Sequence, residues 1–197
     1  ESEAAAPGNE LTAPEASATA QATSDAEVLV FASVQDLIAL LEEQDWWGEP
    51  RADEPLQAPR LLITAIGPSW QEASKSIPVK DKKGLFYRLM LPQVMHANYM
   101  VMEFRAGLEQ AQRELDSDGR VSEQSLALLR RLALLLPGDA EEHVTALQEN
   151  APELKDMISS LLYRVDVVPA GLALGQAAYE SGYGTSRFAV EGNSLFG

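Results

Sequence analysis

The sequence contains no cysteine and comparatively few basic residues. The absence of cysteine excludes disulfide frameworks, thiolate nucleophiles and cysteine-rich metal sites. Lys and Arg number 15 against 30 Asp and Glu, which gives a formal net charge of -15, so nucleic-acid phosphates would be repelled. No apolar stretch approaches the roughly 20 residues that a membrane-spanning helix needs. We therefore expect no nucleic-acid partner and no transmembrane segment.

Histidine is also scarce, with His96 and His143 the only two. Neither has a carboxylate or second histidine at metal-ligand spacing on its helix face, so we expect no metal site and treat both as structural. The serines of ESGYGTS lie on the wrong sides of the glycines for a nucleophile elbow, and the stretch lacks the pattern of a phosphate-binding loop. The sequence implies no cofactor.

Residues 1–26 consist almost entirely of Ala, Ser, Thr, Glu, Pro and Gly, with Leu11 the only large apolar side chain. Such a segment cannot offset its own ordering entropy, so we predict a disordered acidic linker. The chain begins with Glu1 and ends at Gly197 inside an unfinished motif. We therefore expect a processed or cut product whose signal peptide has been removed.

We predict that residues 27–80 form a small region that contains both helix and strand. Ser33 and Asp36 have capping-box-like spacing before an apolar run, which predicts a helix of about three turns. Trp46 and Trp47 end this helix, and although such a pair could stack on sugar rings, we favour packing against a core. RLLITAI (60–66) predicts a β-strand, and the polar stretch 69–82 predicts a connector.

Residues 81–197 predict a helical domain. Apolar residues recur at intervals of three and four from 83 to about 117, which indicates one long amphipathic helix, kinked near Pro92 and stopped by Gly119. Further helices are predicted at 122–136, from Asp139 with Glu142 as a capping box, and at about 152–163.

The most informative stretch is VPAGLALGQAAYESGYGTSRFAVEGNSLFG (168–197). Pro169 suits the first turn of a helix that Glu180 closes, and Gly182 and Gly184 can turn the chain sharply behind it. The negative end of the helix dipole and nearby aromatic residues would favour the protonated carboxyl group and raise the pKa of Glu180. A raised pKa suits a general acid that protonates a departing sugar oxygen.

LALGQAAYESGYGTSRFAVEGNSLFG (172–197) resembles the signature of the glucosaminidase family, glycoside hydrolase family 73. RVDVVP (164–169) and KGLFYRLMLPQVMHAN (83–98) are similar to the Bax-type members from Gram-negative bacteria. The resemblance covers roughly 55–197. It implies a mainly α, lysozyme-like α+β glucosaminidase domain, truncated here before its β-lobe and preceded by the disordered arm.

The resemblance also implies site residues. Glu180 matches the catalytic acid of the E-S-G motif, and Asn193 matches the asparagine that shapes the turn into the β-lobe. We expect the substrate-binding cleft to be lined by Gln176, Tyr183, Phe188, Asn193 and Phe196. Gly175 stands where alanine is usual and Tyr183 where tryptophan is usual. Tyrosine keeps an aromatic wall, and Gly175 costs about 1 kcal/mol of helix propensity.

The implied activity is hydrolysis of the β-1,4 bond after N-acetylglucosamine in peptidoglycan glycan strands, in the periplasm or envelope of a Gram-negative bacterium. Family members bring a second carboxylate from the β-lobe, and Glu191 is a poor substitute because it lies in a turn. We therefore expect the 197-residue chain to be inactive. Two alternatives stay open: a non-catalytic peptidoglycan-binding or envelope-assembly module, and a regulatory role for residues 28–80. An inverting and a substrate-assisted mechanism are both compatible with the sequence.

Overall fold

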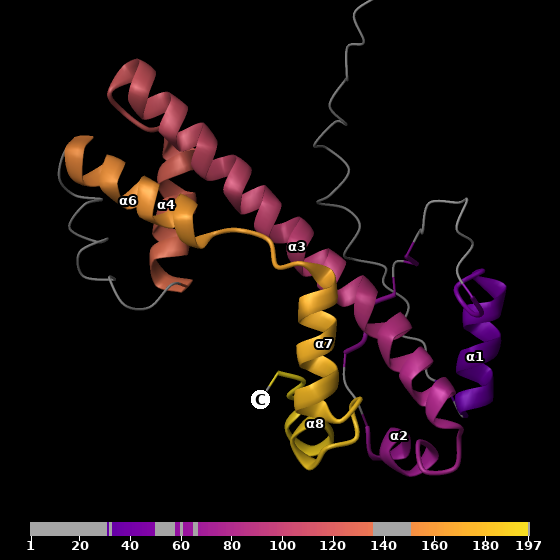
Figure 1. Cartoon of the computed structure of the whole chain (residues 1–197). Coiled ribbons are helices and arrows are strands. Elements are labelled where there is room, and N and C mark those ends of the chain that lie inside the picture. Colours follow the sequence, from indigo (N-terminus) through magenta and orange to yellow (C-terminus); the bar gives the residue numbers. More distant parts are fainter. Residues whose placement is uncertain are drawn as a thin grey trace, which may run out of the picture. The chain divides into compact units, whose positions relative to one another are not determined.

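The computed structural model describes residues 31, 33–49, 58–59, 61–64, 67–135 and 151–196. The described residues form a mainly α fold, as predicted, and contain no β-strand (Figure 1). The predicted linker 1–26, the helix expected from Asp139 and the side chain of His143 lie outside the described residues.

The central element is α3, a 40-residue helix spanning Val79–Asp118. It begins after Pro78, four residues earlier than the sequence predicted, and continues through Pro92. The predicted stop is confirmed: Gly119 adopts a left-handed conformation with φ 66°, and its N–H donates to the Leu115 carbonyl at 3.0 Å. A residue without a Cβ takes this conformation at little cost.

Two predicted helices pack on the C-terminal half of α3. They are α4 (Glu123–Leu135) and α6 (Ala151–Arg164). Their apolar faces and that of α3 share one buried core, consisting of Leu108, Ala111, Leu115, Leu129, Leu132, Ala133, Leu154, Met157, Ile158, Leu161 and Val165. The three-and-four spacing of these residues places them on one face of each helix. This explains why the sequence predicted both helices.

The N-terminal half of α3 packs against α1 (Val34–Glu43). The predicted cap of α1 is confirmed, because Ser33 Oγ accepts a hydrogen bond from the Asp36 N–H at 3.1 Å. The packing role of the tryptophans is confirmed as well: Trp46 is buried, and the half-buried Trp47 packs against the same core. Trp46 Nε1 also donates to the Arg88 carbonyl at 3.0 Å.

The strand predicted at 60–66 is wrong for the residues that can be described, since 61–64 have no regular secondary structure. Two of their carbonyls are hydrogen bonded to side chains: Leu61 O accepts from Gln93 Nε2 at 2.9 Å, and Thr64 O accepts from Asn193 Nδ2 at 3.2 Å. β-Branched composition favours a strand only where a neighbouring strand supplies backbone partners. No such strand occurs in the described part of the chain.

The stretch 69–82, predicted as a connector, contains α2 (Pro68–Ala73) and the start of α3. Pro68 occupies the first turn of α2, where its fixed φ favours a helix and its missing N–H is not needed. The chain then closes with α7 (Ala170–Ser181), which was predicted, and α8 (Arg187–Gly192), which was not. None of the described helices combines the length and apolarity needed to cross a bilayer.

Candidate functional site

The candidate acid Glu180 lies in the last turn of α7, one residue before the helix ends at Ser181. Its side chain is exposed, as is that of Gln176 one turn earlier. Residues four apart on a helix share a face, so Gln176 and Glu180 lie side by side on the open surface of α7. The Glu180 carboxylate has no hydrogen bond or ion pair with the described part of the chain, and it is therefore available to a ligand.

The turn after Glu180 consists of three successive residues in the left-handed conformation. Gly182, Tyr183 and Gly184 have φ values of 57°, 60° and 76°. The sequence predicted such a turn at the two glycines. Tyr183 was not expected to share it, because a bulky side chain costs about 1–2 kcal/mol in this region. The surrounding structure must stabilise Tyr183 there, and such strain is typical of functional sites.

Ser181 is the residue that holds this turn together. It is 1% exposed, and its Oγ donates to the Ala177 carbonyl at 2.5 Å while accepting from the Gly184 N–H at 2.9 Å. The Ser181 carbonyl accepts two more bonds, from the N–H groups of Thr185 and Ser186, at 3.0 and 2.8 Å. A buried polar group with all its partners satisfied fixes local geometry, so the backbone beside Glu180 is tightly defined.

Two side chains of α2 also donate hydrogen bonds to backbone carbonyls of this turn. Trp70 Nε1 donates to the Tyr183 carbonyl at 3.1 Å, and Gln71 Nε2 donates to the Thr185 carbonyl at 2.9 Å. Sequence reasoning missed both residues because their stretch was predicted to be a polar connector. The available signal was Trp70 itself, since an isolated tryptophan in a polar stretch usually finds a buried or bonded position.

Aromatic residues surround the Tyr183 ring. Its centroid lies 5.6 Å from that of Phe86 and 5.9 Å from that of Tyr87, both in edge-to-face arrangements. The Lys83 ammonium lies 5.2 Å from the centre of the Tyr183 ring. Partial burial raises the pKa of the Tyr87 phenol, and the neighbouring Tyr183 side chain raises it further. Tyr87 therefore stays an uncharged phenol at neutral pH.

The small residues of α7 explain how it approaches α3 closely. Ala177 and Ala178 are buried against Phe86 and Met90 of α3. Larger side chains at these positions would hold the helices farther apart. The closely packed face of α7 therefore positions Tyr183 against α3 and leaves Glu180 on the open side.

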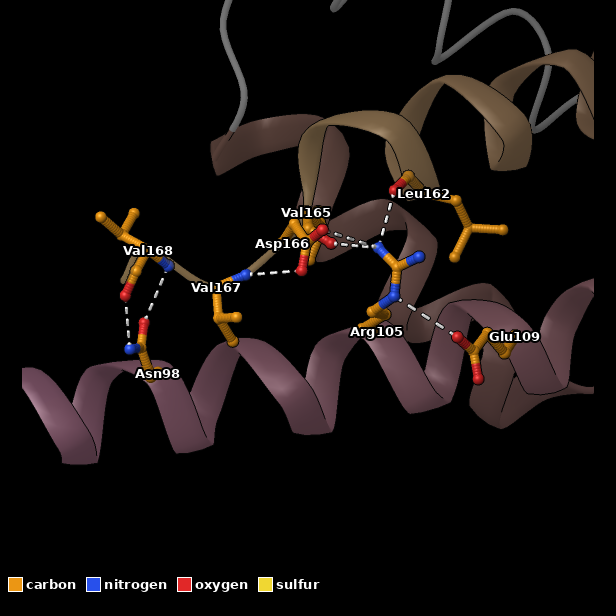
Figure 2. A network of polar contacts seen from close by, with 8 residues as sticks. All are labelled: Asn98, Arg105, Glu109, Leu162, Val165, Asp166, Val167 and Val168. Atoms are coloured by element: carbon orange, nitrogen blue, oxygen red, sulfur yellow. Dashed lines mark hydrogen bonds and ion pairs between the residues drawn. The ribbon is translucent and has the colours of Figure 1, made fainter. Parts of the chain in front are cut away.

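A polar network fixes the chain immediately before α7 (Figure 2). Asn98 of α3 exchanges two bonds with the Val168 backbone, donating to its carbonyl at 2.8 Å and accepting from its N–H at 3.1 Å. Arg105 donates to the carbonyls of Leu162 and Val165, each at 2.9 Å. Figure 2 shows these side chains reaching from α3 to the segment that joins α6 to α7. The start of α7 is thereby held in register with α3.

The other predicted site residues lie at the surface. Phe188 is 68% exposed and Phe196 is 49% exposed. Tyr179, expected to help desolvate Glu180, is 86% exposed. Asn193 caps α8 in a left-handed conformation, and its amide bonds the Thr64 carbonyl. Glu191, which was expected in a turn, lies instead within α8, and its carboxylate is 3.9 Å from the Arg187 guanidinium at the surface.

The described residues contain no group of three or more His, Asp or Glu side chains that could hold a metal ion. The exposed His96 lies on α3. The arrangement therefore combines three features: the exposed Glu180 carboxylate, the hydrogen-bonded turn that follows it, and the Tyr183 ring packed beside Lys83. Comparisons with family models, curated proteins and solved structures gave no match to this chain.

Proposed function

We propose that this chain contains the opening part of a lysozyme-like peptidoglycan N-acetylglucosaminidase, with Glu180 as the general acid. The proposal extends to a location in the periplasm or envelope of a Gram-negative bacterium. It rests first on the resemblance of 172–197 to glycoside hydrolase family 73, whose motif includes Glu180 and Asn193.

The observation that carries the proposal is the construction of the turn behind Glu180. A solvated glutamate at a helix end needs no special support, yet this one is followed by a buried serine with paired hydrogen bonds and a tyrosine in a strained conformation. Two side chains of α2 hold the same turn. A catalytic group has to be held near its productive geometry by such a supporting shell.

In the proposed reaction, the Glu180 carboxyl group donates its proton to the oxygen that leaves the anomeric carbon of N-acetylglucosamine. The Tyr183 ring would stack on a sugar, and Gln176 would hydrogen bond a sugar substituent from the same helix face. The second carboxylate, or the substrate's own acetamido group, would stabilise the positive charge that develops on the sugar ring, and a water molecule would then add its oxygen to the anomeric carbon and return a proton to Glu180. The family implies that a β-lobe supplies that carboxylate.

Exposed aromatic side chains favour a second candidate, glycan binding without cleavage. Tyr179, Phe188 and Phe196 all present much of their ring surface to solvent, and rings in that position can stack on sugars. We propose that the 197-residue chain by itself binds glycan without cleaving it.

The decisive test is Glu180→Gln in the extended enzyme, in which the chain continues into the β-lobe. Glutamine keeps the shape of the side chain but has no acid proton, so turnover should fall about 100- to 10,000-fold while glycan binding persists. Muropeptide release from purified peptidoglycan measures turnover, and co-sedimentation with the same material measures binding.

Glu191→Gln is the matched control, because Glu191 is also an exposed glutamate near a helix end. It should change neither readout. A Glu180→Gln enzyme that keeps more than about a tenth of wild-type turnover would contradict the general-acid role. Loss of thermal stability in proportion to activity would instead indicate a structural glutamate.

A further inference from the structure

The N–H groups of the turn behind Glu180 are bonded to the end of α7. Of the four N–H groups from 183 to 186, the first donates to the Ala178 carbonyl at 3.1 Å and the second to Ser181 Oγ at 2.9 Å. The last two donate to the Ser181 carbonyl at 3.0 and 2.8 Å. The carbonyl groups of the same stretch take no part in these bonds, so their direction depends on other partners.

The peptide group that joins Tyr183 to Gly184 is held at both ends. Its N–H donates to Ser181 Oγ, and its carbonyl accepts from Trp70 Nε1 of α2 at 3.1 Å. The C=O and N–H bonds of a trans peptide point in opposite directions, so the two partners lie on opposite sides of it. Rotation of this group would change the left-handed backbone angles of both residues that it joins. Such a conformation persists only where the surrounding structure over-determines it, and the bond from Trp70 is one of the constraints.

The peptide group between Thr185 and Ser186 is held in the same way. Its N–H donates to the Ser181 carbonyl at 2.8 Å, and its carbonyl accepts from Gln71 Nε2 of α2 at 2.9 Å. Ser181 and two consecutive residues of α2 therefore hold the turn from opposite sides. We refer to Trp70 and Gln71 together as the α2 clamp.

The position of α2 is set by the core that α1 and α3 share. The half-buried side chains of Trp70 and Ala73 pack against the buried residues of this core, which are Val34, Leu41, Trp46 and Leu85. The buried Ser74 also donates from its Oγ to the Gln71 carbonyl at 2.9 Å. Directional bonds from a packed element define position. The α2 clamp therefore fixes the turn relative to the core of α1 and α3.

The turn in turn holds the part of α7 that carries Glu180. The last carbonyls of a helix have no partners further along it, so this end frays most easily. Here the Ala178 carbonyl accepts from the N–H groups of Gly182 and Tyr183. Movement of Tyr183 would release one of these bonds and loosen the last helical turn. Glu180 would then lose its defined position.

Resting on the proposed function, we propose that Trp70 and Gln71 are positioning residues of the candidate site. They contact no reacting atom in this role. They hold two peptide groups and, through them, the Tyr183 ring and the last turn of α7 with Glu180. Part of residues 28–80, for which the sequence left a regulatory role open, is thereby assigned to the support of the site.

The first test measures amide hydrogen exchange by NMR in the 197-residue chain and needs no ligand. Trp70→Phe keeps an aromatic ring but removes the donor, so the Gly184 amide should exchange about 2- to 10-fold faster relative to the buried Leu161 of α6. Gln71→Met should accelerate the Ser186 amide by a similar factor. Exchange ratios that stay at the wild-type values in both variants would overturn the proposal.

Trp46→Phe is the matched control. Trp46 Nε1 also donates to a distant main-chain carbonyl, that of Arg88, at 3.0 Å, but this bond is not made to the turn. We expect Trp46→Phe to lower thermal stability about as much as Trp70→Phe does and to leave the exchange ratio of Gly184 unchanged. Equal acceleration of Gly184 by the two substitutions would show a general loss of stability and would overturn the positioning role.

The second test measures the turnover number of the extended enzyme at saturating concentrations of soluble peptidoglycan fragments. Trp70→Phe should lower it by up to about 100-fold, because a misplacement of about 1 Å can cost that much. In the Glu180→Gln background the same substitution should lower turnover by less than about twofold, since the acid that it positions is absent. An equal fall in both backgrounds would show that Trp70 acts independently of Glu180 and would overturn the proposal.

The two proposals fail in different ways. An extended wild-type enzyme without turnover contradicts the proposed function, while the exchange rates still decide whether the α2 clamp fixes the turn. Turnover that falls with Glu180→Gln but not with Trp70→Phe leaves the proposed function intact and overturns the positioning role.

Discussion

The two halves of α3 are stabilised by different means. The C-terminal half packs against α4 and α6 through a leucine-rich core, and polar contacts such as those of Arg105 with the Leu162 and Val165 carbonyls lie at its edge. The N-terminal half meets α1, α2 and α7 through aromatic rings, alanines and side-chain bonds to distant carbonyls, such as Trp46 to Arg88. Apolar burial stabilises without fixing orientation, whereas hydrogen bonds are directional. The candidate site lies at the N-terminal half, where aromatic rings and hydrogen bonds, and not a leucine core, make the contacts.

The largest effect is expected from Leu129→Ala in the leucine core. Leu129 is fully buried, and truncation should lower the free energy of unfolding by about 2–5 kcal/mol. Leu134→Ala, on the same helix but 81% exposed, should change it by less than about 0.5 kcal/mol. Urea denaturation followed by circular dichroism measures both.

The same variant tests whether the two halves unfold together. All three tryptophans, Trp46, Trp47 and Trp70, belong to the half that contains the site. Because α3 joins the halves without interruption, tryptophan fluorescence should report the same shift for Leu129→Ala as circular dichroism. A fluorescence transition that stays at the wild-type midpoint would show that the halves are independent.

A smaller effect is expected from Ser181→Ala in the turn behind Glu180. The substitution leaves the buried Gly184 N–H without its acceptor, which should cost about 1–3 kcal/mol. Affinity for N-acetylglucosamine oligomers should fall as well, because the turn that holds Tyr183 loosens. Ser159→Ala is the control: Ser159 Oγ bonds a carbonyl four residues earlier in the same way, but at the surface of α6. It should affect neither quantity.

The smallest effect concerns Glu114, near the end of α3. Hydrogen bonds, first that from the Ser122 backbone N–H, lower the pKa of Glu114 to about 2. A carboxyl pKa that is lower in the folded state stabilises the fold above the usual carboxyl pKa, and this contribution is lost as the pH falls from about 4.5 to about 2. Glu114→Gln should remove that part of the pH dependence.

Titration of the Glu114 side chain by NMR checks the pKa directly. Ser122→Ala removes the hydroxyl bond of 3.2 Å but keeps the backbone bond of 2.8 Å. The pKa of Glu114 should therefore rise only part of the way toward its ordinary value. A Glu114 pKa near 4.5 in the wild-type protein would contradict the assignment.

Five helices, α1, α3, α4, α6 and α7, could be predicted from the sequence because their signals are local, whereas the six-residue α2 and α8 were not predicted. Ser33 with Asp36, Gly119 and the three-and-four spacing of α3, α4 and α6 each act within a few residues. The strand prediction failed because the β-branched residues at 61–66 give only a propensity for extended backbone. They do not supply the neighbouring strand to which a β-strand must hydrogen bond. The position of the candidate acid and the turn behind it could also be predicted from neighbouring residues, namely Glu180, Gly182 and Gly184.

The support of the site could not be predicted in this way. The bonds from Trp70 to Tyr183 and from Gln71 to Thr185 join residues more than a hundred positions apart. The Lys83 contact with Tyr183 likewise depends on how α7 lies against α3. No spacing rule connects such residues, and only the packed fold brings them together.

The double attachment of α7 to α3 has a consequence for insertions and deletions. Asn98 bonds the backbone just before α7, and Phe86 contacts the ring just after it. These two residues are twelve positions apart on α3, a rise of about 18 Å, which equals the length of the 12-residue α7. One added or removed residue within α7 would rotate Glu180 by about 100° relative to one attachment. We expect this segment to accept many substitutions but no change of length.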